Sequence, residues 1–172
     1  MLVLAVAFAT LFSPKTMRVD YFHTGDRGRE IVALDRIVSD GPWAGSTTRL
    51  IDDLNLGTYF FEVIDAASGR AIYARGFASL YGEWEDTAEA KTETRTFHES
   101  LRFPWPKGKV TVVLKKRGAD GTFKPIWTTK IDPSSPAANS SDAAPQGKVW
   151  TVFESGPPTD KVDLLILGEG YT

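Results

Sequence analysis

The 172-residue sequence contains no cysteine, and this absence removes several kinds of site at once. Disulfide bridges, thiolate metal ligands and cysteine nucleophiles all need a thiol, so none of them contributes to this protein. Histidine is also rare, with two residues in the whole chain. Any imidazole chemistry would therefore depend on His23 or His98.

Neither histidine stands in a complete metal-binding motif. His98-Glu99 begins like the H-E-x-x-H motif of zinc peptidases, but Arg102 occupies the place of the second histidine. The motif also needs a helix to bring both imidazoles onto one face, whereas this segment alternates like a strand. We expect His98 to point outward from a strand, and His23, near Asp20 and Asp26, to be a surface or turn residue.

Acidic and basic residues are nearly balanced, and the formal net charge is −2. Binding to nucleic acid needs a concentrated positive field, so we expect no nucleic-acid partner. The only basic run is Lys115-Lys116-Arg117, which we interpret as a solvated hairpin edge rather than an anion site. The apolar run from Leu2 to Phe12 is shorter than the roughly 20 residues of a membrane span.

That apolar run instead suits the central region of an export signal, although a basic segment before it is missing. Small residues follow the A-x-A pattern at Ala5, Ala7 and Ala9, and Ser13-Pro14 ends the run. The sequence predicts a signal peptide over residues 1–14 and a secreted, periplasmic or cell-surface location. The alternative is that the run forms a first strand.

The sequence lacks any sustained helical repeat of apolar residues. Short segments rich in β-branched and aromatic residues alternate with turns such as Ser68-Gly69 and Asp120-Gly121. Residues 15–132 are therefore predicted to form an all-β domain, an antiparallel β-sandwich of about seven strands. Strands are expected at 16–23, 29–38, 58–66, 70–78, 94–103, 109–117 and 122–131, with at most a short surface helix at 85–93.

The composition changes after the predicted sandwich. Residues 133–147 are dominated by Pro, Ser, Ala and Asn, which indicates a linker. Residues 148–172 differ again, because Leu164 to Leu167 are consecutive apolar residues, typical of a strand covered on both faces in a parallel sheet. The sequence thus predicts a linker and then the first strand of an incomplete α/β domain.

Acidic and aromatic residues gather in two places. Asp52-Asp53-x-Asn55-x-Gly57 has part of the pattern of a calcium loop but lacks its later acidic ligands, so we favour side chains that cap a turn. Four acidic residues, Glu83, Glu85, Asp86 and Glu89, flank Trp84 and follow Tyr81 in the sequence. We favour a solvated acidic turn over a sugar-binding site for this segment. Tyr81 and Trp84 are expected in a loop, where such rings often cover a neighbouring surface. We predict that they contact a second domain or a ligand.

The glycines Gly168 and Gly170 follow an apolar strand, as in the dinucleotide fingerprint, but the third glycine of that motif would have to stand immediately after Thr172, and two glycines suit any tight strand-to-helix turn. A nucleotide-binding enzyme is therefore a remote alternative. No serine nucleophile elbow or phosphate loop occurs in the sequence. The residues by themselves contain no complete active site.

Four stretches nevertheless resemble the N-terminal region of the IgA-peptidase family of bacterial zinc metallopeptidases, peptidase family M64. They are TMRVDYFHTGD, RLIDDLNLGTYFFEVID, the long stretch from Tyr73 to Pro106, and LILGEGYT at the end. The resemblance implies a β-sandwich followed by a zinc-dependent catalytic domain that opens with a strand and a Gly-x-Gly-Tyr-Thr turn. The zinc motif would lie beyond Thr172, so no catalytic, cofactor-binding or metal-binding residue is assigned in this chain.

We therefore expect a non-catalytic accessory domain, truncated at the start of the catalytic domain, that positions the catalytic domain or a substrate protein. Zinc is expected in the missing catalytic domain, and the expected partners are that domain and a protein or glycoprotein substrate. The alternative is a free-standing β-sandwich module that binds carbohydrate or protein.

Overall fold

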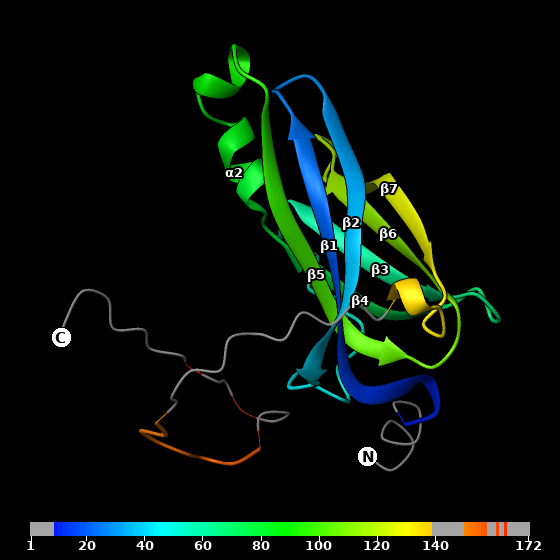
Figure 1. Ribbon diagram of the computed structural model, residues 1–172. Helices are drawn as coiled ribbons and strands as arrows, with labels where there is room; N and C mark the ends of the chain where they lie inside the picture. The colour runs from blue at the N-terminus through cyan, green and yellow to red at the C-terminus, as the bar shows by residue number, and fades with distance from the viewer. Residues whose placement is uncertain (1–8, 139–149, 158–160, 162–163, 165–172) are drawn as a thin grey trace.

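The structure is a computed structural model that describes residues 9–138, 150–157, 161 and 164. Seven antiparallel strands form two sheets that face each other as a β-sandwich (Figure 1). The strands are β1 (Phe12–Gly25), β2 (Glu30–Pro42), β3 (Tyr59–Asp65), β4 (Ala71–Phe77), β5 (Arg95–Pro106), β6 (Val110–Arg117) and β7 (Phe123–Ile131). The all-β prediction is confirmed, and each strand overlaps a range expected from the sequence, although β1 begins earlier, at Phe12, and β2 and β5 extend further, to Pro42 and Pro106.

The two sheets have different strand orders. The first runs β2-β1-β5, so the long strand β1 lies in its centre, and the second runs β4-β3-β6-β7. Strand β6 is therefore an interior strand, which makes the predicted hairpin-edge position of the basic run 115–117 wrong. The two edges of the second sheet are β4 and β7.

The core lies between the sheets and follows the strand alternation. Met17, Val19 and Tyr21 of β1 point inward and are almost completely buried, as are Val112 and Leu114 of β6. Each such apolar side chain contributes roughly 1.5–3 kcal/mol when it is fully removed from water. The alternation expected for β5 is also confirmed, since Leu101 and Phe103 are buried in the core.

Tight turns join the strands of both predicted hairpins. Gly69 and Gly121 have φ values of 67° and 77°, a region that glycine enters without steric cost. Between β3 and β4, the carboxylate of Asp65 accepts hydrogen bonds from the backbone and the hydroxyl of Ser68. The glycines and polar side chains that predicted these turns in the sequence therefore form the turns in the structure.

One short helix differs from the prediction. Tyr81 and Trp84 lie on α2 (Leu80–Glu85), beside β5, and not in a loop (Figure 1). Ser79 caps the helix, since its hydroxyl oxygen accepts a hydrogen bond from the backbone N–H of Gly82. Single turns of 3-10 helix follow at η1 (Glu89–Lys91), inside the expected segment 85–93, and at η2 (Pro136–Ala138).

Several predictions concern residues outside the described part of the chain. These are most of the linker 133–147, the predicted strand over Leu164 to Leu167 apart from Leu164, and the glycines 168 and 170. Of the predicted signal peptide 1–14, residues 9–14 are described, and β1 begins at Phe12, whose side chain belongs to the core at 1% exposure. Among the described residues, no helix is long and apolar enough to cross a bilayer.

Candidate functional site

His23 is fully buried, so its predicted position at the surface is wrong. Its Nε2 lies 2.7 Å from a carboxylate oxygen of Glu30, and its Nδ1 lies 2.9 Å from one of Glu99. The imidazole also stacks on the ring of Tyr81, with the ring centroids 4.0 Å apart. One side chain of β1 thus contacts β2, β5 and α2.

These contacts select the charged form of the imidazole. A neutral imidazole carries one N–H and could donate to only one of the two carboxylates, whereas the charged form donates to both. Burial by itself lowers the pKa of His23, but the hydrogen bonds and charges of Glu30 and Glu99 outweigh burial and raise that pKa above its usual value. The site therefore holds an imidazolium between two carboxylates.

A lysine completes this buried network. The Nζ of Lys116 donates to Glu30 at 2.8 Å and to Glu85 of α2 at 2.7 Å. Glu30 also accepts a hydrogen bond of 2.9 Å from the hydroxyl of Tyr59. Burial raises the pKa of Glu30, but the hydrogen bonds from His23, Lys116 and Tyr59 outweigh it and lower the pKa to about 2. Lys116 is thus a half-buried structural cation and not a solvated one.

Tyr81 and Trp84 are buried within the domain, with exposed fractions of 0% and 8%. The backbone N–H of Tyr81 donates to Glu99 at 3.0 Å. The ring of Trp84 packs on Phe97 with centroids 5.5 Å apart, and its Nε1 donates to Glu89 at 2.9 Å. The neighbouring surface that these rings cover is therefore the domain's own first sheet.

The outer face of the first sheet carries a second charged cluster. Asp20, Asp35 and His98 have potential metal-ligand atoms within 4.8 Å of one another. However, the Nε atoms of Arg18 and Arg36 donate to Asp20 at 2.8 and 3.0 Å. Burial raises the pKa of Asp20, but these two hydrogen bonds outweigh burial and lower it. Because two guanidinium groups already neutralise Asp20 and repel a cation, this donor set does not fit a metal ion.

His98 itself lies where the sequence placed it. Its side chain is 46% exposed, and its Nε2 is 3.0 Å from a carboxylate oxygen of Asp35. The outward orientation that the strand alternation predicted is confirmed.

The loop that follows residue 51 is closed by a carboxylate cap. Asp52 accepts hydrogen bonds of 2.9 Å from the backbone N–H groups of Leu54 and Gly76. Asn55 and Gly57 take positive φ values of 53° and 83°. The arrangement agrees with the turn-capping interpretation and uses the Asp52 oxygens that a calcium ion would need.

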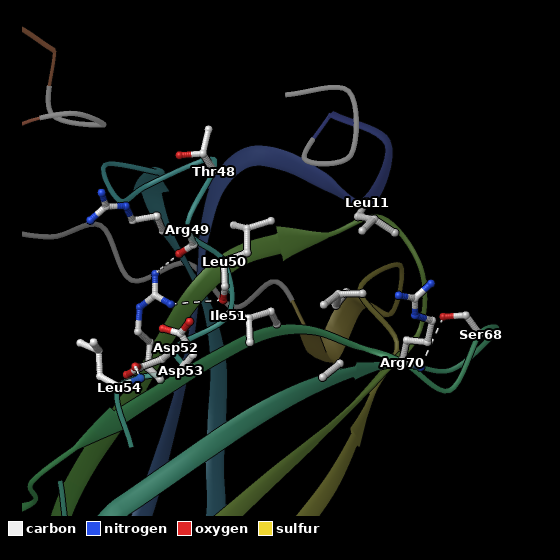
Figure 2. A pocket seen from close by; sticks show the side chains of 13 residues that line it. Leu11, Thr48, Arg49, Leu50, Ile51, Asp52, Asp53, Leu54, Ser68 and Arg70 are labelled. Carbon is white, nitrogen blue, oxygen red and sulfur yellow. Dashed lines mark hydrogen bonds between the residues drawn. The ribbon is translucent and has the colours of Figure 1, made fainter. Parts of the chain in front are cut away.

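A groove of about 1040 Å³ runs along the exposed side of β4 (Figure 2). Its size reaches the upper range of ligand-binding clefts, roughly 300–1,000 Å³. Figure 2 shows Arg49 and Arg70 on opposite sides of the groove with Leu50 and Ile51 between them. The lining residues are Leu11, Thr48, Arg49, Leu50, Ile51, Asp52, Asp53, Leu54, Ser68, Arg70, Ala71, Ile72 and Arg75.

The wall of this groove is fixed to the sheet edge. The backbone N–H of Ala74 donates to the carbonyl of Leu50 at 2.9 Å, and the N–H of Asp52 donates to the carbonyl of Ala74 at 3.2 Å. The guanidinium of Arg75 also donates to the carbonyl of Leu50. Residues 50–52 therefore cover one half of the β4 edge, while Ala71 and Ile72 in the other half border the groove. Sequence patterns gave no signal for it, because its sides come from segments that are distant in the chain.

A family model described as Peptidase M64 N-terminus matches residues 7–128. The matched range contains β1 to β6, α2 and most of β7. No curated protein matches the chain.

Proposed function

Because the chain belongs to the peptidase M64 N-terminus family, we propose that its β-sandwich is a non-catalytic accessory domain that positions the catalytic domain of a secreted zinc metallopeptidase. The observation that carries this proposal is the agreement between the matched range, 7–128, and the sandwich. The same range holds His23 and His98, and each of these histidines is committed to carboxylates of the sandwich itself. In this proposal the two histidines support the fold, and another domain supplies the chemistry.

The hydrolytic chemistry is expected to come from zinc bound by an H-E-x-x-H motif, which does not occur within these 172 residues. The residues described here would contribute orientation only. A positioning domain must resist deformation, because small displacements at an active site lower the rate of reaction. The two sheets and the ion-paired network around His23 provide such a rigid body.

A rigid apolar loop is the best candidate contact with the catalytic domain. Leu54 and Leu56 are 69% and 64% exposed. The loop between them is held by Arg117, whose guanidinium donates to the carbonyls of Asn55 and Gly57 at 2.8 Å. Large exposed apolar side chains on an ordered loop are typical of protein–protein contacts. In this proposal Tyr81 and Trp84 act indirectly, by holding α2 on the sandwich.

The test uses the sandwich and the catalytic domain of the parent protein as separate polypeptides. We expect calorimetry to detect their association, and we expect Leu56→Asp to weaken it at least tenfold, because a charge would be buried in the interface. Leu34→Asp is the matched control, since Leu34 is a 42% exposed leucine on β2. We also expect full-length enzyme with Leu56→Asp to lose activity toward a protein substrate.

Two results would contradict the proposal. One is full activity and undiminished stability of the catalytic domain when the sandwich is deleted. The other is tight binding of a polysaccharide or mucosal glycoprotein to the isolated sandwich without any association between the domains, which would favour a free-standing binding module.

A further inference from the structure

The groove beside β4 borders part of an edge strand. β4 is an edge of the second sheet, and an edge strand has backbone polar groups on one side that no strand of its own sheet pairs. At Ala74 that side is closed, because its N–H donates to Leu50 and its carbonyl accepts from the N–H of Asp52. At Ala71 and Ile72 the strand borders the groove instead. An extended peptide placed there would continue the sheet, which is the binding mode called β-strand addition.

Apolar side chains lie next to this part of the strand. Leu50, Ile51 and Ala71 line the groove, and Ile51 is 49% exposed. Successive side chains of an extended peptide point to opposite sides, so one row can contact these residues while the other row points away. Removal of both apolar surfaces from water would stabilise the contact.

The charges of the groove select the kind of peptide. Figure 2 shows Arg70 beside Ser68 at one end, and Arg49 and Asp53 at the other. Arg70 is exposed, and its guanidinium has no ion-pair partner among the described residues. The carboxylate of Asp65 accepts hydrogen bonds from Ser68 and is not among the described residues that line the groove. The Arg70 end is therefore positively charged.

The remaining charged side chains of the lining are committed to the domain itself. The guanidinium of Arg75 donates to the carbonyls of Leu50 and Ala74 at 3.2 and 2.8 Å. The carboxylate of Asp52 accepts from the backbone N–H groups that were described above. Arg70 is thus the cation that a ligand in the groove can neutralise, and a carboxylate suits it because it accepts charge-assisted, often bidentate, hydrogen bonds.

We propose that this groove binds an extended acidic segment of a partner protein. The backbone of the segment pairs with β4 at Ala71 and Ile72, one of its carboxylates pairs with Arg70, and its apolar side chains pack on Leu50 and Ile51. This inference does not depend on the proposed role in positioning a catalytic domain, because the groove can bind such a segment whether or not the two domains associate.

Fluorescence anisotropy with the 172-residue chain tests the proposal. The probe is a dye-labelled peptide of alternating glutamate and valine, and the comparison peptide has glutamine in place of glutamate. We expect saturable binding of the acidic peptide with a dissociation constant below about 1 mM. The glutamine peptide should bind at least about tenfold more weakly, because it cannot form the charge-assisted contact.

Two charge reversals locate the contact. Arg70→Glu should weaken binding of the acidic peptide at least about tenfold, because a carboxylate would then face a carboxylate. The matched control is Arg27→Glu, at an exposed arginine between β1 and β2, and it should change the affinity by less than about twofold. The melting temperature should stay unchanged in both variants, since both arginines lie on the surface.

Nuclear magnetic resonance of the unsubstituted chain tests the backbone pairing. Titration with the acidic peptide should shift the amide resonances of Ala71 and Ile72 and leave that of Thr128 on β7 unchanged. Three results would overturn the proposal: no saturable binding of the acidic peptide up to about 1 mM, equal weakening by the two charge reversals, or binding without shifts at Ala71 and Ile72.

Discussion

His23 links three parts of the domain through one buried side chain. Its two nitrogens contact Glu30 of β2 and Glu99 of β5, and its ring stacks on Tyr81 of α2. A buried charge is tolerated only when its partners compensate for lost hydration. The contacts of His23 therefore make the stability of the whole sandwich sensitive to protonation.

The free energy of unfolding should be highest between about pH 4.5 and 6.5. The pKa of Glu30 is lowered from 4.5 to about 2, so its contribution is present above pH 4.5 and is lost as the pH falls toward 2. The pKa of His23 is raised above 6.5, so its contribution is present below pH 6.5 and is lost as the pH rises through the folded-state pKa. Urea unfolding at a series of pH values measures both declines.

Replacement of each histidine separates this network from the rest of the protein. His23→Gln should remove the decline above pH 6.5, because the titrating group is absent, even though the variant is less stable overall. His98→Gln is the matched control and should keep the decline, since His98 is 46% exposed and lies outside the buried network. A decline that persists unchanged in His23→Gln would contradict the assignment.

At the scale of secondary-structure elements, α2 depends on its packing rather than on its length. Six residues are too few for an isolated helix to be stable in water. Trp84 supplies much of the contact, with its ring against Phe97 of β5 and Tyr81 of the same helix. The helix in turn supplies Glu85 to Lys116, so its loss would also expose the buried network.

Trp84→Ala should therefore destabilise the domain by about 3 kcal/mol, the low end for truncation of a buried tryptophan. Hydrogen exchange at residues 80–91 should accelerate more than exchange in β1, because α2 would open locally. Leu80→Ala on the same helix is the control, and its effect should stay within about 0.5 kcal/mol, because Leu80 is 62% exposed. Similar losses in the two variants would show that Trp84 does not anchor the helix.

At the scale of the whole molecule, the described strands form one sandwich that closes before the predicted linker. The last strand, β7, ends at Ile131, and Ala138 of η2 still packs in the core. By contrast Trp150, Val152 and Phe153 are 76%, 91% and 82% exposed. Those apolar side chains add nothing to the core of the sandwich in this arrangement.

Removal of residues 139–172 should therefore change the melting temperature by less than about 2 °C. The physical reason is that the remaining chain keeps all seven strands of the described residues and the whole described core. Differential scanning calorimetry of chains 1–138 and 1–172 makes the comparison. A clearly lower melting temperature for the shorter chain would mean that part of residues 139–172 packs on the sandwich.

Sequence alone determined the strands because their signals are local. Alternation in β5 and turn glycines at 69 and 121 depend on neighbours within a few residues, and a strand has the same two-residue period in any sandwich. The family resemblance also rested on local stretches, and the match to residues 7–128 confirms it. The absence of cysteine likewise excluded disulfides, thiolate metal ligands and cysteine nucleophiles from the sequence alone.

Tertiary structure decided what happens to the polar residues. His23, Lys116 and Tyr81 look like surface or loop residues in the sequence, yet they meet in one buried network because β1, β6 and α2 converge there. Burial and charge pairing depend on segments up to 86 residues apart, as for Glu30 and Lys116. Local sequence patterns do not show which residues distant in the chain come into contact. Only the packing of the two sheets brings these residues together in one site.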